Sequence, residues 1–417
     1  MAEAERAAEQ AKIEASARRI TEEVAAAREL PVTGEFAVEL IDRKGVRAFV
    51  EEAIYEEMTR DELALLGRID ASLGILPIGS DFEQLLLDMY ETGVLGIYDP
   101  KRKTLLIGDY VDRGQLGMVV GHEGAHGLQD MHFDLEALNH MNKGHSDSDT
   151  AQTFLIEGDA QAAYLAWVSG DDGLTGISDE ILQLQADLVL RIREDMGIPH
   201  TILARQMQMP YSDGTMNVLR LARDEGWAAV DALYAELPAS SEQMLHPDKL
   251  RTREAPIPVT IDAEILIALA QDQTPDPDPS DPDPSDPDPA REVVWEVVWE
   301  DELGEATILA MLAEVAGVGA ARAAAAGWGG DRFVALDRKT DPAAAPLVIG
   351  VVTWDTRADA KQFESLFRTY LEARRPGAFS LVRRRSSVLY ATELEDTLTG
   401  AAVSKAGWSA FTIGNKP

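Results

Sequence analysis

Apolar residues recur at helical spacing through most of the first two thirds of the chain. The N-terminal stretch is rich in Ala, Glu and Arg and places Ile13, Ile20 and Val24 on one helical face. Pro31 closes this stretch, so the pattern predicts an N-terminal helical arm over residues 1–30. Further helices are predicted over 46–67, 80–91, 114–133 and 151–167.

A short β pattern interrupts these helices. The segment GIYDPKRKTLLIG (96–108) changes to strand-like residues around a Pro-Lys turn, which predicts a β-hairpin. A polar break, NHMNKGHSDSD (139–149), separates the two helices that follow. The expected order is therefore strand, helix, loop and helix, within a mainly helical α+β domain over 31–272.

The segment QTPDPDPSDPDPSDPDPA (273–290) cannot form a packed core, because proline removes hydrogen-bond donors and the aspartates repel one another. We expect a disordered, extended linker there. After it, apolar runs predict strands over 333–336, 347–354 and 380–394, and an amphipathic helix over 358–373. Residues 291–417 are accordingly predicted to form a small α+β accessory domain.

Charge and composition argue against nucleic-acid binding, a membrane span and cysteine-based metal sites. The 417 residues carry 38 Lys+Arg against 73 Asp+Glu, a net charge of −35, and no cysteine. Such a chain repels nucleic-acid backbones, and no apolar run is long enough for a membrane span. Without cysteine, the strong metal ligands are His, Asp and Glu. The N-terminus lacks the apolar region of a signal peptide, so we expect a cytoplasmic protein, or a secreted or periplasmic one if the chain is a trimmed mature form.

The predicted helix over 114–133 contains an HExxH motif, His122-Glu123-Gly124-Ala125-His126. In a helix the two histidines lie one turn apart and only about 40° around the axis, so both imidazoles can converge on one ion. Glu123 is turned to the side, where its carboxylate can accept a proton from a water without ligating the metal. A chance occurrence of two unrelated histidines remains the plainer interpretation of the motif alone.

A catalytic zinc ion requires a third protein ligand. Glu157 is one candidate, because Phe154, Ala160 and Tyr164 share its helical face and a buried carboxylate needs a partner. The alternatives are a salt bridge to an arginine, or a kink at Gly158 that lets the acid reach solvent. His132 is a second candidate by its spacing, although a continuous helix would turn it away from the metal.

These motifs resemble those of a known group. HEGAH followed by the glutamate of EGDA resembles the gluzincin zinc metallopeptidases. More closely, EGAHGLQDMHFDLEAL (123–138) and LIEGDAQAAYL (155–165) resemble a bacterial and archaeal family of largely uncharacterised predicted metallopeptidases typified by HELTHALQDQHFDL and VEGDA. The resemblance implies a zincin-like fold over 31–272. It also implies Zn²⁺ held by His122, His126 and Glu157, with Glu123 as the general base.

Several further residues are candidates for the same site. A peptidase needs a donor for the oxyanion, and Tyr211 and His246 lie in polar, loop-like stretches with a proton to donate, although either could be purely structural. Asp130 and Asp159 are candidates to orient a ligand. We also expect strand 104–108 to form the edge of the substrate cleft.

The sequence thus predicts a zinc-dependent peptidase acting on a peptide or protein substrate. The alternative is a catalytically silent, zincin-fold metal-binding or adaptor protein that acts through its tethered C-terminal domain. Substrate preference, endo- or exopeptidase action and oligomeric state are not predicted.

Overall fold

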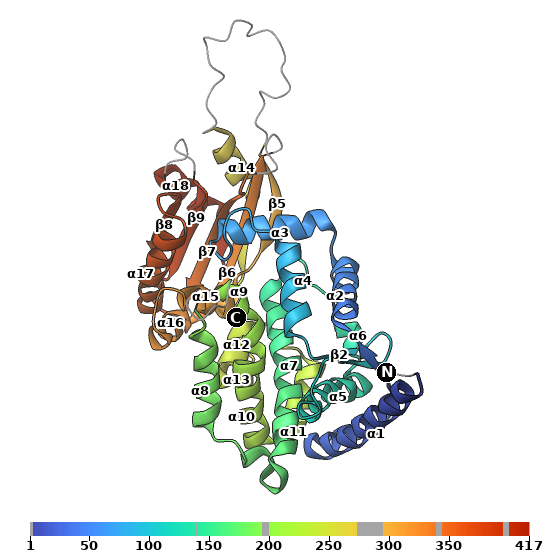
Figure 1. Ribbon diagram of the computed structural model, residues 1–417. Coiled ribbons are helices and arrows are strands. Elements are labelled where there is room, and N and C mark those ends of the chain that lie inside the picture. Colours follow the sequence, from blue (N-terminus) through green and yellow to red (C-terminus); the bar gives the residue numbers. More distant parts are fainter. Residues whose placement is uncertain are drawn as a thin grey trace, which may run out of the picture.

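The computed structural model describes residues 3–138, 140–193, 200–272, 295–338, 344–394 and 400–416. They form an α+β structure, as the sequence predicts, in which most of the helices come from the N-terminal part and the largest sheet from the C-terminal part (Figure 1). The predicted Asp-Pro linker over 273–290 lies outside the described residues.

The first helix, α1 (Glu3–Arg28), packs against α5 (Leu116–Phe133) and α7 (Ser146–Val168). Its predicted apolar face buries Ile20 and Val24. A Cβ on Gly124 of α5 would lie 2.5 Å from the Thr21 hydroxyl of α1, so the close approach of the two helices requires glycine there. The segment predicted as an arm is therefore packed onto the helices of the candidate site (Figure 1).

Three helices follow, α2 (Arg43–Glu57), α3 (Arg60–Ser72) and α4 (Phe82–Gly93). The single helix predicted over 46–67 is thus wrong, because the chain breaks between α2 and α3. Thr59 and Glu62 form a capping box that starts α3, and this satisfies backbone donors that a continuous helix would otherwise bond internally.

A three-stranded sheet joins β1 (Ala37–Ile41), β2 (Gly96–Asp99) and β3 (Thr104–Gly108) in the order β1-β3-β2. β2 and β3 form the predicted antiparallel hairpin, and β1 pairs with β3 in parallel. β3 is therefore the central strand, and the expectation that it forms a cleft edge is wrong. The edge strand beside α5 is β2.

The helix α5 lies within the predicted span 114–133, and the short α6 (Leu135–Leu138) follows it. The helix α7 includes the predicted span 151–167 but begins at Ser146, inside the predicted polar break 139–149. The elements that follow are η1 (Gly170–Thr175), α8 (Asp179–Leu190), α9 (Thr201–Met209), the π-helical turn η3 (Pro210–Gly214), α10 (Thr215–Glu225), α11 (Trp227–Ala235), α12 (Ser241–Leu245), α13 (Pro247–Thr252), β4 (Val259–Ile261) and α14 (Ala263–Asp272). Within the described ranges, no helix has the length and apolarity needed to cross a bilayer.

The C-terminal part is built on a five-stranded antiparallel sheet in the order β5-β6-β7-β9-β8. The predicted strands and the predicted amphipathic helix are all present. The elements are β5 (Trp295–Asp301), α15 (Gly304–Leu312), α16 (Val318–Ala325), β6 (Trp328–Arg338), β7 (Leu347–Trp354), α17 (Arg357–Arg374), β8 (Phe379–Arg384), β9 (Ser387–Thr392), α18 (Gly400–Ala410) and β10 (Phe411–Ile413).

Packing continues across the predicted domain boundary. One hydrophobic cluster contains Phe154 and Met209 from the first part together with Leu309 and Phe367 from the second. The strand β4 pairs with β10, and α14 packs against α18 and β5. The division of the chain into 31–272 and 291–417 stays a prediction, and the structure adds that the two parts share a core.

Buried aspartates mark one contact between the two parts, which we call the acidic junction and define as Asp147, Asp301 and Asp331. Asp147 of α7 accepts hydrogen bonds from the backbone and hydroxyl of Ser241. Asp301 accepts them from the backbone N–H and hydroxyl of Ser146, at 2.8 and 2.6 Å. The Asp331 carboxylate accepts from the first backbone N–H groups of the α15 region. Each buried carboxylate therefore has donors, most of them uncharged.

Candidate metal centre

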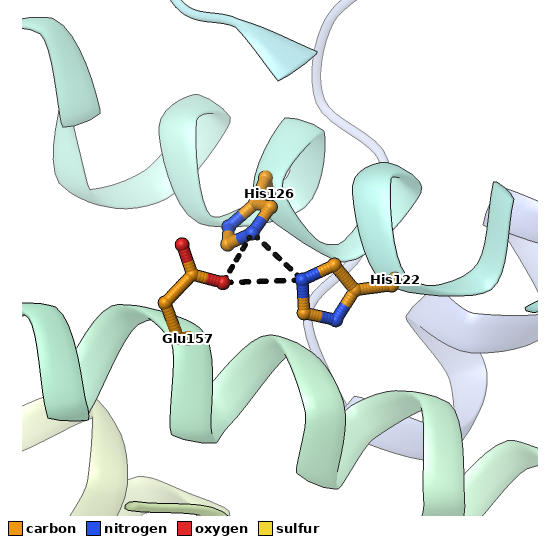
Figure 2. A group of neighbouring side chains, drawn as sticks. All are labelled: His122, His126 and Glu157. Carbon is orange, nitrogen blue, oxygen red and sulfur yellow. Dashed lines mark hydrogen bonds and ion pairs between the residues drawn. The ribbon is translucent and has the colours of Figure 1, made fainter. Parts of the chain in front are cut away.

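Three side chains from two helices converge on one point, which we call the metal triangle (His122, His126 and Glu157). His122 and His126 project from successive turns of α5, and Glu157 faces them from α7 (Figure 2). The Glu157 Oε2 atom lies 3.1 Å from His122 Nε2 and 3.2 Å from His126 Nε2, and the two Nε2 atoms are 3.2 Å apart. Both histidines are buried.

This triangle fits a tetrahedral zinc ion. Zinc binds imidazole nitrogen and carboxylate oxygen at about 2.0–2.1 Å, so two donors of a tetrahedral site lie roughly 3.3 Å apart. The three observed separations are all close to that value. Two histidines and one glutamate also form a ligand set used by catalytic zinc, with the fourth position left for water or substrate. The described residues at this point therefore fit the ion that the sequence predicts.

The charges of the triangle are strongly perturbed. Burial opposes the charged form of His126, but the Glu157 carboxylate outweighs it and raises the pKa of His126 to about 9. Burial likewise opposes ionisation of Glu157, and the two histidines overcome it and hold the pKa of Glu157 well below its usual range. The ionised carboxylate is therefore paired with an imidazole proton, and a metal ion that binds here has to displace that proton.

Glu123 stands beside the triangle without being part of it. Its Oε2 atom accepts a hydrogen bond of 3.0 Å from the backbone N–H of Tyr98 on β2. The carboxylate is half-buried, so it has contact with both the protein and the solvent. The edge strand β2 thus fixes the orientation of the residue predicted as the general base.

Tyr211, the residue predicted as an oxyanion donor, lies beside the triangle. Its ring centroid lies 5.5 Å from that of His122, and 40% of the residue is exposed. Desolvation, followed by the charges of Glu157 and Glu123, raises the pKa of Tyr211 well above its usual value, so the hydroxyl keeps its proton. The π-helical turn that carries Tyr211 is held against α7 by a backbone contact, since a Cβ on Gly158 would lie 2.6 Å from the carbonyl carbon of Gly214.

The structure does not bring His246 to the triangle. Its Nε2 atom instead contacts both carboxylate oxygens of Glu305 on α15, at 2.8 and 3.0 Å. The role of oxyanion donor expected for His246 is therefore unsupported, and its contact joins the two parts of the chain. His132 is exposed, with its Nε2 atom 2.8 Å from the Pro31 carbonyl oxygen, and it is not part of the triangle.

The two aspartates expected to orient a ligand have different places. Asp130 accepts hydrogen bonds from the Tyr98 hydroxyl and Lys103, and it has no described contact with either histidine. Asp159 reaches the triangle through Gln129, whose amide lies between Asp159 and His126.

A second group of carboxylates, Glu242, Glu254 and Asp355, is also compact enough to hold a cation. Lys249 occupies its centre and forms ion pairs with all three, and Lys416 pairs with two of them. This group is accounted for by its lysines, and it joins helix α13 to the C-terminal part.

Sequence reasoning missed two residues near the site. Gln129 carried a signal, because it follows His126 by three positions and so shares its helical face. Tyr90 of α4 carried none. Burial and the charge of Glu157 raise the pKa of Tyr90, which places this second tyrosine within electrostatic reach of the triangle.

Comparison with known proteins finds a match in the C-terminal part of the chain. Residues 290–407 match the model of a domain of unknown function, DUF8575. This segment covers α15 to α17 and the five-stranded sheet and leaves out the metal triangle. No curated protein and no solved structure matches the chain.

Proposed function

We propose that the protein is a zinc-dependent peptidase with a zincin-like metallopeptidase fold over 31–272. The proposal rests above all on the metal triangle, whose three donor separations match those of a tetrahedral zinc site. When bound, zinc supplies a Lewis acid that activates water for attack on a carbonyl carbon.

The protein residues around the triangle supply the remaining chemistry. Glu123, oriented by β2, takes the proton that the attacking water releases and delivers it to the leaving amine. Tyr211 stays protonated and donates a hydrogen bond to the oxyanion that forms when water adds to the peptide carbonyl. The outer edge of β2 offers backbone groups along which an extended peptide can pair.

The experiment compares the full chain with Glu123→Gln. The variant removes the proton acceptor and no ligand, so we expect zinc content to stay at one equivalent and hydrolysis of unfolded casein to fall by at least about 100-fold. Metal content would be measured by mass spectrometry after dialysis, and hydrolysis by peptide release.

A matched control is Glu136→Gln, which makes the same change on the exposed surface of α6. It should keep both zinc and activity. Full activity in Glu123→Gln would refute the mechanism, whereas bound zinc without turnover in the unaltered protein would support the metal-binding adaptor instead.

A further inference from the structure

A buried chain of hydrogen bonds leads from the metal triangle to the N-terminal helix. His126 Nδ1 lies 2.8 Å from Gln129 Oε1, and Gln129 Nε2 lies 3.0 Å from Asp159 Oδ2. Asp159 in turn accepts a hydrogen bond of 2.6 Å from Arg28 Nε, at the last residue of α1. Gln129, Asp159 and Arg28 are each only 1% exposed, so water does not compete for these bonds.

The amide of Gln129 has a single possible orientation. Its nitrogen donates to the Ile156 carbonyl and to Asp159, which are two acceptors that a carbonyl oxygen could not bond. The Gln129 oxygen must then face His126 and accept the Nδ1 proton. In the neutral imidazole, which is the form that binds a metal, this fixes the His126 tautomer and leaves the Nε2 lone pair pointing at the triangle.

The two histidines of the triangle differ in whether their Nδ1 atom has a hydrogen-bond partner. The Nδ1 atom of His122 is buried and has no hydrogen-bond partner among the described residues. His126 is therefore the ligand whose ring the protein orients. Orientation of the ring by a partner is what raises the affinity of a histidine for its metal.

Asp159 anchors the chain of bonds by its charge. It also accepts a hydrogen bond from the Tyr234 hydroxyl, and Arg28 binds both of its oxygens and Asp231 as well. Trp227 stacks under the Arg28 guanidinium at 4.4 Å. Since Arg28 belongs to α1, its contacts with Asp159, Asp231 and Trp227 exist only while α1 is docked.

We propose that Gln129 is the positioning residue for His126 and that, through Asp159 and Arg28, docking of α1 sets the zinc affinity of the triangle. This inference rests on the proposed zinc site. It carries a reciprocal consequence, because if a docked α1 strengthens zinc binding, zinc must strengthen the docking of α1 by the same factor. The N-terminal helix then belongs functionally to the metal centre.

The first test measures zinc affinity on the full chain by competition with a chromogenic chelator. Gln129→Leu keeps the approximate volume and removes both amide functions, so we expect zinc to bind about 10- to 100-fold more weakly than in the unaltered protein. Asn217→Leu is the matched control, since it removes a buried amide that donates to the Met244 carbonyl of α12. It should leave the zinc affinity unchanged.

The second test follows α1 directly by hydrogen exchange over residues 17–28, with and without zinc. Zinc should slow exchange there in the unaltered protein and have little effect in Gln129→Leu. Asp159→Asn, which keeps the shape of the side chain and removes its charge, serves the same comparison if Gln129→Leu does not fold. A structural role alone would change unfolding but not this zinc dependence.

The outcomes separate the two proposals. Zinc binding that is equally tight in Gln129→Leu, or exchange in α1 that ignores zinc in the unaltered protein, would overturn the inference while leaving the zinc site in place. Absence of zinc binding in the unaltered protein would overturn the zinc site itself and this inference with it.

Discussion

The metal triangle and the acidic junction both bury carboxylates on α7, but with opposite consequences. At the triangle, the two histidines outweigh desolvation and lower the pKa of Glu157. At the junction, desolvation dominates, raising the pKa of Asp147 well above its usual value and that of Asp331 to about 7. The hydrogen-bond partners of each carboxylate decide whether its pKa is lowered or raised. Imidazoles favour a carboxylate that stays charged and attracts a cation, whereas backbone and hydroxyl donors leave a carboxylate that tends to hold its own proton.

The largest expected difference between the two regions is in metal binding. Glu157→Ala removes one of three ligands, so we expect its zinc affinity to fall by more than about 100-fold, since loss of an outer partner alone costs 10- to 100-fold. Asp147→Asn changes a carboxylate of the same helix at the junction and should keep zinc. The measurement is chelator competition on both variants. Tight zinc binding in Glu157→Ala together with its loss in His132→Ala would show that the third ligand is misassigned.

A second difference is expected in the pH dependence of stability. Asp331 has a folded pKa of about 7 against 3.8 when unfolded, so the folded state binds more protons. The contribution of Asp331 to the free energy of unfolding is therefore fully present below about pH 4. It is lost as the pH rises through 7, and the total loss is on the order of 4 kcal/mol. Asp331→Asn should remove this part of the pH dependence.

Urea unfolding at several pH values measures that effect as the difference between Asp331→Asn and the unaltered protein. Asp248→Asn, at a fully exposed position, is the control and should follow the unaltered protein throughout. A pH profile of Asp331→Asn that is parallel to that of the unaltered protein would contradict the view that this carboxylate holds its proton.

The smallest effect concerns how Tyr211 is held beside the triangle. Gly158→Ala places a Cβ against the backbone of Gly214, which cannot move aside like a side chain, so we expect a loss of about 1–3 kcal/mol of stability and a displaced Tyr211. Gly117→Ala on α5 has 3.9 Å to its nearest neighbour and should stabilise by up to about 1 kcal/mol. The measurement is the midpoint of thermal unfolding of the two variants. If Gly158→Ala unfolds at the same temperature as Gly117→Ala, the backbone contact between α7 and η3 can adjust to a Cβ.

Local periodicity was enough to predict α5, α7, the β2-β3 hairpin and the C-terminal strands, because each follows from neighbouring residues. The partners of these elements were not predictable in the same way. Nothing within TLLIG (104–108) reveals that β1 pairs on its far side, and nothing within residues 3–29 reveals that the helix packs on α5. The break before α3 did carry a signal, the Thr59 and Glu62 pair, which a search for helical periodicity overlooks.

The residues of the candidate site were likewise predictable only where the signal lies in neighbouring residues. The spacing of His122, Glu123 and His126 is local, and the apolar face around Glu157 indicated a buried acid in need of a partner. His246 shows the limit of such reasoning. Its polar surroundings indicated a proton donor, but its partner, Glu305, is distant in sequence and belongs to the other part of the chain. A polar neighbourhood predicts that a histidine has a partner, without predicting which one.

The elements on either side of the Asp-Pro segment are held together. The helix α14 and the strand β5, which flank this segment, pack against each other. The backbone N–H of Trp295 donates a hydrogen bond of 3.4 Å to the side-chain oxygen of Gln271. The described residues on either side of the segment therefore lie side by side. Closure of such a loop costs little more as it lengthens. We therefore expect that a polypeptide cut within this segment reassembles from its two fragments through their common core.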